Sequence, residues 1–218
     1  MPVTGLRASS MQNLVLNEGA FLVGFDYSSY TTAAALEAAI IAALQDASKL
    51  LGATNGGGTF VCTPETRQIE IDGIRGKVKG ATHVDSWTIQ LTGTLKEIKK
   101  ATLAKLMMCS DVDETVTNIT KITLHNDIES TDYISNLCWV GSTPYGYVLI
   151  GMTDVLNTAG VTMTFKDKNE ATIPFTFESH SNSLTGDDDL PVEVILLTAA
   201  ENAVTIPSQG STQTTTNP

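Results

Sequence analysis

The sequence predicts a mainly β protein with accessory helices, of the β-sandwich type with a flanking α-helix. Three observations support this class. Many segments of the 218-residue chain alternate apolar and polar residues, which is typical of strands with one buried face. Two other stretches place apolar residues at helical spacing. Because strands precede and follow the second of these stretches, the order fits an α+β fold or a sandwich with an added helix.

The N-terminal part is expected to contain one or two strands followed by a helix. Residues 14–16 and 20–25 are apolar, and Asn17-Glu18-Gly19 between them has the composition of a turn. An alanine-rich segment comes next. Its apolar residues recur at steps of three and four, which predicts a helix over residues 32–51 that stops at Gly52.

A glycine-rich loop and a β-hairpin are expected after this helix. Gly56, Gly57 and Gly58 predict a flexible loop, which with the helix would form an insertion over about residues 32–58. Residues 68–79 then alternate on both sides of Asp72-Gly73, a dipeptide that favours a tight turn. In the second half of this hairpin, three cations stand at two-residue spacing and would share one face of a strand: Arg75, Lys77 and Lys79.

The cationic stripe is a candidate contact surface. A basic face can bind nucleic acid, but the chain has 24 acidic against 13 basic residues and a formal net charge of −11. Carboxylates of a partner subunit are therefore the better match, and a plain solvated face is the alternative. We expect the stripe and the triple glycine to be inter-subunit contacts.

A second helix is expected after the strand at residues 87–92. Thr94-Leu-Lys-Glu97 has the sequence of a capping box, in which each polar side chain binds the backbone amide of the other residue. The apolar residues that follow form one stripe. The pattern predicts a helix over residues 95–108 that covers an edge or end of the sheet.

The second half returns to strands and ends in a polar tail. Pro174 cannot donate to a strand ladder, so its strand should be at an edge there or carry a bulge. The tail, residues 206–218, has no apolar anchor and is expected to be disordered. The expected strands are residues 119–125, 147–150, 161–165, 173–177 and 192–197.

Composition limits the possible functions. Charged residues make up only 17% of the chain and hydrophobic ones 42%, so we expect an ordered domain with part of its surface covered by partners. Residues 1–10 lack the pattern of a signal peptide, and residues 38–44 are too short to span a bilayer. The three cysteines are widely separated and are expected to be buried thiols: Cys62, Cys109 and Cys138.

No motif for a cofactor or a metal emerges. Residues 52–59 resemble a phosphate loop, but they lack its lysine and stand between a helix and a strand in the wrong order. Residues 111–114 begin like a calcium loop without its later glycine and glutamate, so an acidic surface turn is expected. Residues 187–189 are three aspartates. Such a run can recruit a divalent ion, but a solvated loop is expected.

Catalytic residues are not expected either. His83, His125 and His180 have no metal-binding spacing and are expected at the surface. Neither a GxSxG nor an HExxH motif is present. A triad assembled from distant residues stays open, because triads are defined by geometry. The sequence favours a protein that is not an enzyme.

Four segments, taken in order, resemble the tail tube (major tail) proteins of siphophages, the long-tailed bacteriophages, from Gram-positive hosts. The resemblance lies in their order and spacing, and together they cover most of residues 14–197. The segments are residues 51–60, residues 67–80, residues 87–107, and residues 173–180 with Leu190-Pro-Val-Glu193 after them.

The resemblance implies a single tail-tube-like domain over residues 1–205, without catalytic residues or cofactors. It implies hexameric rings that stack into a tube, which conducts DNA during ejection without binding it specifically. The expected place is the virion tail, after assembly in the host cytoplasm. The expected partners are tape measure, tail completion and baseplate proteins, with no membrane contact. There are two alternatives: a tube protein of a phage-like bacteriocin or secretion system, and an unrelated β-rich binding module.

Overall fold

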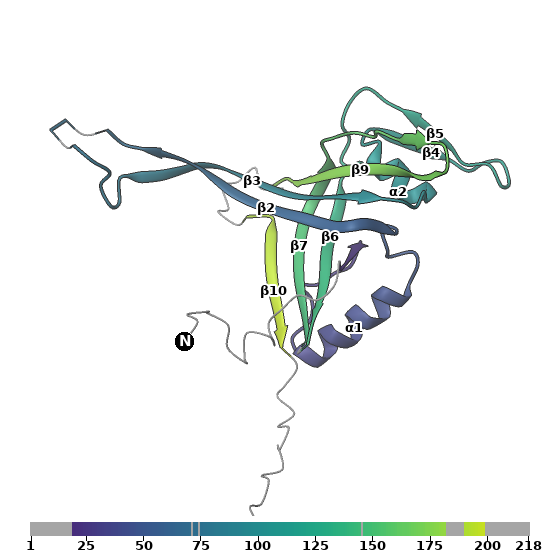
Figure 1. Cartoon of the computed structure of the whole chain (residues 1–218), viewed down its shortest axis with the longest axis horizontal. Helices are drawn as coiled ribbons and strands as arrows, with labels where there is room; N and C mark the ends of the chain where they lie inside the picture. Colours follow the sequence, from purple (N-terminus) through teal and green to yellow (C-terminus); the bar gives the residue numbers. More distant parts are fainter. Residues whose placement is uncertain (1–18, 71, 74, 145, 182–189, 199–218) are drawn as a thin grey trace, which may run out of the picture.

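The structure, a computed structural model, describes residues 19–70, 72–73, 75–144, 146–181 and 190–198. Most of this part is antiparallel sheet with two helices, which confirms the predicted mainly β class with accessory helices (Figure 1). The elements are β1 (Ala20–Val23), α1 (Ala33–Gln45), β2 (Thr54–Gln68), β3 (Thr82–Leu95), α2 (Lys100–Leu106), β4 (Ser110–Asp113), β5 (Lys121–Leu124), β6 (Ile134–Thr143), β7 (Gly146–Asn157), β8 (Thr164–Lys166), β9 (Asn169–Ser179) and β10 (Val192–Thr198).

One sheet carries most of the strands, in the order β1-β6-β7-β9-β3-β2, with β10 beside β7 and β8 beside β9. Strand β7 is its dividing line. One side of β7 pairs with β6, whereas the other side pairs first with β10 and then, over its last residues, with β9. The sheet therefore bends after β7, and β2, β3 and β9 cross β6, β7 and β10 (Figure 1).

The core lies between the two halves of this bent sheet. Phe21 of β1 and Phe175 of β9 meet edge to face, with ring centroids 5.2 Å apart, although two strands, β6 and β7, lie between β1 and β9 in the sheet order. Both rings are buried in one cluster with residues from β3, β6 and β7. The halves face each other as in the predicted sandwich, but one continuous sheet forms both layers.

Helix α1 covers the outer face of the β1–β6–β7–β10 half. Leu36 and Ile40 are buried against residues from these strands. The predicted start at Thr32 is right, since its Oγ1 accepts a hydrogen bond from the Ala35 amide. The predicted end at Gly52 is wrong. The helix stops at Gln45 because the Asp46 carboxylate accepts from the Ser48 amide and hydroxyl, which turns the chain.

The predicted capping box is wrong. Thr94 lies inside β3, paired with Pro174, and α2 begins only at Lys100 without a side-chain cap. The side chain of Leu95 is fully buried in the core, which favours continuing the strand over starting a helix. Glu97 has another role, because its carboxylate accepts a hydrogen bond from the Ala53 amide.

The two threonines make a matched test of capping. Thr32→Ala removes the oxygen that caps α1 and should lower the free energy of unfolding by about 0.5–2 kcal/mol. Thr94→Ala removes no cap and should change it less. Equilibrium urea unfolding of both variants checks this difference, and an equal or larger loss in Thr94→Ala would contradict the observed helix starts.

The predicted flexible glycine loop is also wrong. Gly56 and Gly57 have positive φ angles of 79° and 75° and form an irregularity near the start of β2, and Gly58 pairs with Gly93 of β3. A side chain at Gly58 would start 2.5 Å from the Phe21 ring. The glycines therefore serve a bulge and a close packing contact, and this segment belongs to the sheet.

The later strands agree in part with the prediction. Strands β5, β7, β9 and β10 form at or around the expected segments, β8 begins only at Thr164, and β6 was not expected. One side of β9 pairs with β3. On the other side, β8 pairs with the start of β9 as far as Thr172, and β7 pairs with its end from Phe177 onward. Among the described residues, none pairs with Pro174 on that side, which agrees with its predicted edge position. The expected strand at residues 14–16 and tail at residues 206–218 lie outside the described residues.

Candidate functional site

The longest feature of the structure is the hairpin of β2 and β3, here called the arm. Its strands have 15 and 14 residues, and at about 3.3 Å per residue they would extend for about 50 Å. Only the end near the body pairs with β9, through residues 90–95 of β3. The rest projects away from the body as a free two-stranded ribbon (Figure 1).

One face of the arm continues the apolar surface of the core into solvent. Ile89 and Leu91 lie inside the body and are 3% and 2% exposed, whereas Trp87 and Val84 farther out are 40% and 50% exposed. We call this face the apolar stripe. Its cross-strand pairs are Phe60 with Leu91, Cys62 with Ile89, Pro64 with Trp87, and Thr66 with Val84.

A bulge keeps this face continuous. The register shifts between Glu65 and Thr66, so that Asp85 is the additional residue on β3. Without it, Val84 would point to the opposite face from Trp87 because side chains alternate along a strand. The Asp85 carboxylate is held by the Arg67 guanidinium, with Nε 2.7 Å from Oδ1. Both side chains are largely exposed, so the pair contributes little stability.

The opposite face of the arm is polar. The predicted alternation of Thr88, Gln90 and Thr92 with apolar residues is found in β3. The Thr92 hydroxyl donates to the Thr59 carbonyl, and Gln90 Nε2 donates to the Glu178 carboxylate of β9. The arm thus has one apolar and one threonine-rich face, and both are exposed beyond the body.

The predicted cationic strand does not form. Strand β2 ends at Gln68 and β3 begins at Thr82, so the chain between them is the loop at the tip of the arm. Hydrogen bonds from Ile69 N to Ala81 O and from Ala81 N to Val78 O close this loop. The three cations are exposed in the loop and do not share a strand face: Arg75, Lys77 and Lys79.

The predicted turn at Asp72-Gly73 does form, with Gly73 at a φ of 86°. The loop encloses a shallow hollow of about 330 Å3. Its described lining carries two carboxylates and no nucleophile, so it does not resemble a catalytic cleft. The lining residues are Gln68, Ile69, Glu70, Asp72, Gly73, Gly76 and Val78.

A second uncovered apolar surface lies on β10. Val194 and Leu196 alternate with residues that pack toward α1, and they are 57% and 71% exposed. They pair with Ile150 and Val148 of β7. We call these four residues the sheet patch. Val194 and Leu196 are the exposed members of the patch, whereas Val148 and Ile150 are half-buried.

The expected surface and core positions of several other residues are wrong. Cys62 is exposed on the arm and Cys109 is half-buried, so only Cys138 is the predicted buried thiol, and burial raises its pKa to about 12. His125 was expected at the surface, but its side chain is only 19% exposed and lies against Asp132. His180 packs edge-on against the Tyr133 ring.

The acidic segments also differ from expectation. Residues 111–113 belong to β4 and do not form the expected turn, and Glu114 after them forms an ion pair with Lys100 of α2. Residues 187–189 lie outside the described residues. In the described part of the chain, no helix is both long and apolar enough to cross a membrane.

Trp87 and Val84 were missed as surface residues because alternation marks a face without showing what covers it. The structure shows the reason in the lengths of the strands. About five or six residues are usual for a strand in a globular domain, and β2 and β3, with 15 and 14 residues, extend beyond the core.

Comparisons with known proteins give little information on this chain. No protein-family model matches it, and no curated protein matches its sequence. Among solved structures, a chain described as "Virion of native gene transfer agent (GTA) particle" is similar over 66% of this chain and 86% of that chain, with 12% identity and a TM-score of 0.36. An overlap this loose does not establish a shared fold.

Proposed function

We propose that this chain is a structural subunit that assembles with copies of itself into hexameric rings, which stack as the tail tube of a long-tailed phage. The single observation that carries this proposal is the arm, with an apolar stripe that begins in the core and continues into solvent at Trp87 and Val84. An apolar strand face left in water favours aggregation unless a partner covers it. A defined neighbour in a ring would be such a partner.

The chain offers two different apolar surfaces, as a ring requires. A closed ring forms when one surface of each subunit binds another surface of the next one. The apolar stripe lies on β2 and β3 and the most exposed residues of the sheet patch, Val194 and Leu196, lie on β10, so the two surfaces belong to different halves of the bent sheet. In this proposal the arm of one subunit lies on the sheet patch of its neighbour.

The charge of the chain fits a conduit for DNA. With a formal net charge of −11, the wall of a tube would repel phosphate groups and keep the polymer in the water-filled centre. The threonine-rich face of the arm, with Thr88 and Thr92, would suit either the lumen or a contact between subunits. The partners in this proposal are tape measure, tail completion and baseplate proteins, and the location is the virion.

Two alternatives share part of these features. A tube protein of a phage-like bacteriocin or secretion system would have the same two surfaces without the DNA. A β-rich binding module would have an uncovered surface for another protein, but it would stay monomeric on its own. A test of self-assembly therefore distinguishes the binding module from both kinds of tube protein.

The proposal is tested by self-assembly of the purified chain. Sedimentation velocity over a range of concentrations should show a species larger than the monomer, and negative-stain images of it should show sixfold rings or tubes. A chain that stays monomeric at every concentration and salt, including with seeds of a tail initiator complex, would contradict the proposal.

The loop cations give a separate electrostatic prediction. In a tube, Lys77 and Lys79 should face carboxylates of a neighbouring subunit, so Lys77→Glu/Lys79→Glu should lower tube yield without unfolding the monomer. Lys121→Glu/Lys168→Glu changes two other exposed lysines and is the matched control for net charge.

Titration of labelled duplex DNA against assembled tubes tests whether the same lysines bind DNA. No measurable affinity is expected at moderate salt. Tight, salt-sensitive binding that the Lys77→Glu/Lys79→Glu change abolishes would place these residues on a nucleic-acid surface and contradict the conduit.

A further inference from the structure

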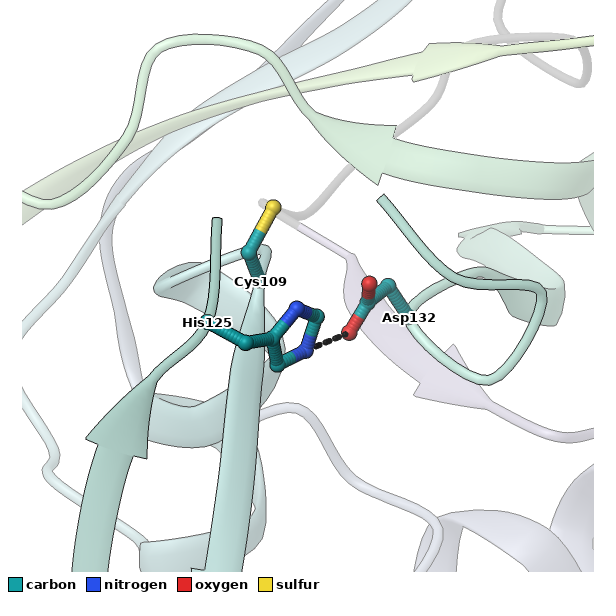
Figure 2. Close-up of side chains that lie close together, drawn as sticks. All are labelled: Cys109, His125 and Asp132. Carbon is teal, nitrogen blue, oxygen red and sulfur yellow. Dashed lines mark ion pairs between the residues drawn. The ribbon is translucent and has the colours of Figure 1, made fainter. Parts of the chain in front are cut away.

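Three side chains with metal-binding atoms converge beside the small β4–β5 sheet. Cys109 stands just before β4, His125 just after β5, and Asp132 in the segment that leads to β6 (Figure 2). One ligand atom from each lies within 4.8 Å of the other two. His125 Nε2 is 3.3 Å from Asp132 Oδ1, and the Asp132 side chain is only 3% exposed.

Contacts around these residues hold them in an orientation that suits a ligand. His125 Nδ1 is 2.6 Å from the carbonyl oxygen of Asp127, which can only accept, so Nδ1 carries the proton and Nε2 faces Asp132. The other Asp132 oxygen accepts a hydrogen bond of 2.7 Å from the Glu129 amide. Such outer contacts to the far nitrogen of a histidine and to a carboxylate are typical of metal sites.

The arrangement needs a cation between the facing atoms. With Nδ1 protonated, a neutral His125 would direct the lone pair of Nε2 at a buried carboxylate oxygen, which is unfavourable without a proton or a metal ion between them. The surroundings favour positive charge. The Asp132 carboxylate and the Asp127 carbonyl oxygen each face one nitrogen of the ring.

We propose that Cys109, His125 and Asp132 bind one divalent transition-metal ion of the Zn²⁺ type, with water as the fourth ligand. A proton would satisfy only the histidine and the aspartate, whereas the sulfur of Cys109 completes a mixed S, N, O set. Zn²⁺ accepts all three donors, and Ca²⁺ and Mg²⁺ prefer oxygen alone. Tetrahedral zinc would place the ligand atoms about 3.3–3.6 Å apart, so the 3.3 Å contact between Nε2 and Oδ1 fits. The Cys109 side chain, which has a ligand atom in the same 4.8 Å group, would have to move its sulfur toward them.

The ion would have a structural role. Strands β4 and β5 pair only with each other in the described sheets, and they expose the apolar side chains of Val112 and Leu124. A metal bound to Cys109, His125 and Asp132 would join the start of β4 and the end of β5 to the segment before β6. The site rests on these contacts and does not depend on whether the chain forms a tube.

Titration of the full-length, reduced protein with Co²⁺ tests the site, because a cobalt–thiolate bond gives charge-transfer absorption. We expect saturation at one ion per chain, release of the absorption by added Zn²⁺, and a higher unfolding temperature with Zn²⁺ than after chelation. Cys109→Ser and His125→Gln should each weaken binding by at least about 10-fold, since even outer-shell changes cost 10–100-fold.

Cys62→Ser is the matched control, because it removes an exposed thiol on the arm and should leave the titration unchanged. The variants at Cys109 and His125 keep the hydrogen bond between Asp132 and the Glu129 amide, so loss of binding would not follow from loss of that turn. No thiolate absorption up to millimolar Co²⁺, or a titration unchanged by Cys109→Ser, would overturn the proposal. Loss of the cobalt–thiolate absorption in Cys62→Ser would also overturn the proposal.

Discussion

Asn157→Leu is expected to lower the free energy of unfolding by about 3 kcal/mol or more, although leucine has nearly the same volume. Asn157 is completely buried at the end of β7. Its amide nitrogen donates to the carbonyls of Leu106 and Gly160, both at 2.7 Å, and its oxygen accepts from the Thr176 amide at 2.9 Å. Leucine would leave three backbone groups without a partner, at about 1–3 kcal/mol for each one that water does not reach.

The effect should be large because one side chain joins three elements. Asn157 connects the end of β7 to α2 through Leu106 and to β9 through Thr176, at the place where the sheet bends. Equilibrium urea unfolding, at a concentration where the chain is monomeric, measures the loss. Thr158→Val changes the exposed neighbour and should stay within about 0.5 kcal/mol of the parent. A loss below 1 kcal/mol for Asn157→Leu would show that water or repacking satisfies these groups.

Sequence patterns predicted the elements where local and long-range preferences agree. The alternation that includes Ile89 and Leu91 identified a strand with one buried face, and Thr32 identified the start of α1. The patterns failed where the two preferences compete. Thr94 and Glu97 have the spacing of a cap, but burial of Leu95 and pairing with β9 extend the strand through this segment. A local motif cannot report that competition.

The two candidate sites were harder to predict because both depend on how the elements are arranged in space, which no local pattern in the sequence shows. Cys109, His125 and Asp132 are separated along the chain by β4, β5 and the segment after them, so no short spacing joins them. Trp87 belongs to an ordinary strand pattern, and only the small size of the body beside β3 leaves it exposed. The triple glycine was misread because close packing against Phe21 and flexibility require the same residue type.

Replacing both Val84 and Trp87 with lysine is expected to prevent assembly while the monomer stays folded. The two residues are 50% and 40% exposed on the arm, away from the core, so the free energy of unfolding should change little. In a ring they would be covered, and two unpaired charges in the contact would each cost about 2–5 kcal/mol. The concentration needed for assembly should therefore rise at least about 100-fold, as sedimentation would measure.

The matched control places the same two charges on the polar face of the same ribbon. Thr63 and Thr88 are exposed and lie opposite each other on β2 and β3, one residue pair nearer the body than Trp87, so Thr63→Lys/Thr88→Lys equals the first variant in charge. If the apolar stripe is the contact, the control should assemble at close to the parent concentration. Equal loss in both variants would mean that charge on the arm, and not the loss of the stripe, blocks assembly. Assembly of the Val84→Lys/Trp87→Lys variant at the parent concentration would exclude this face of the arm from the ring contact.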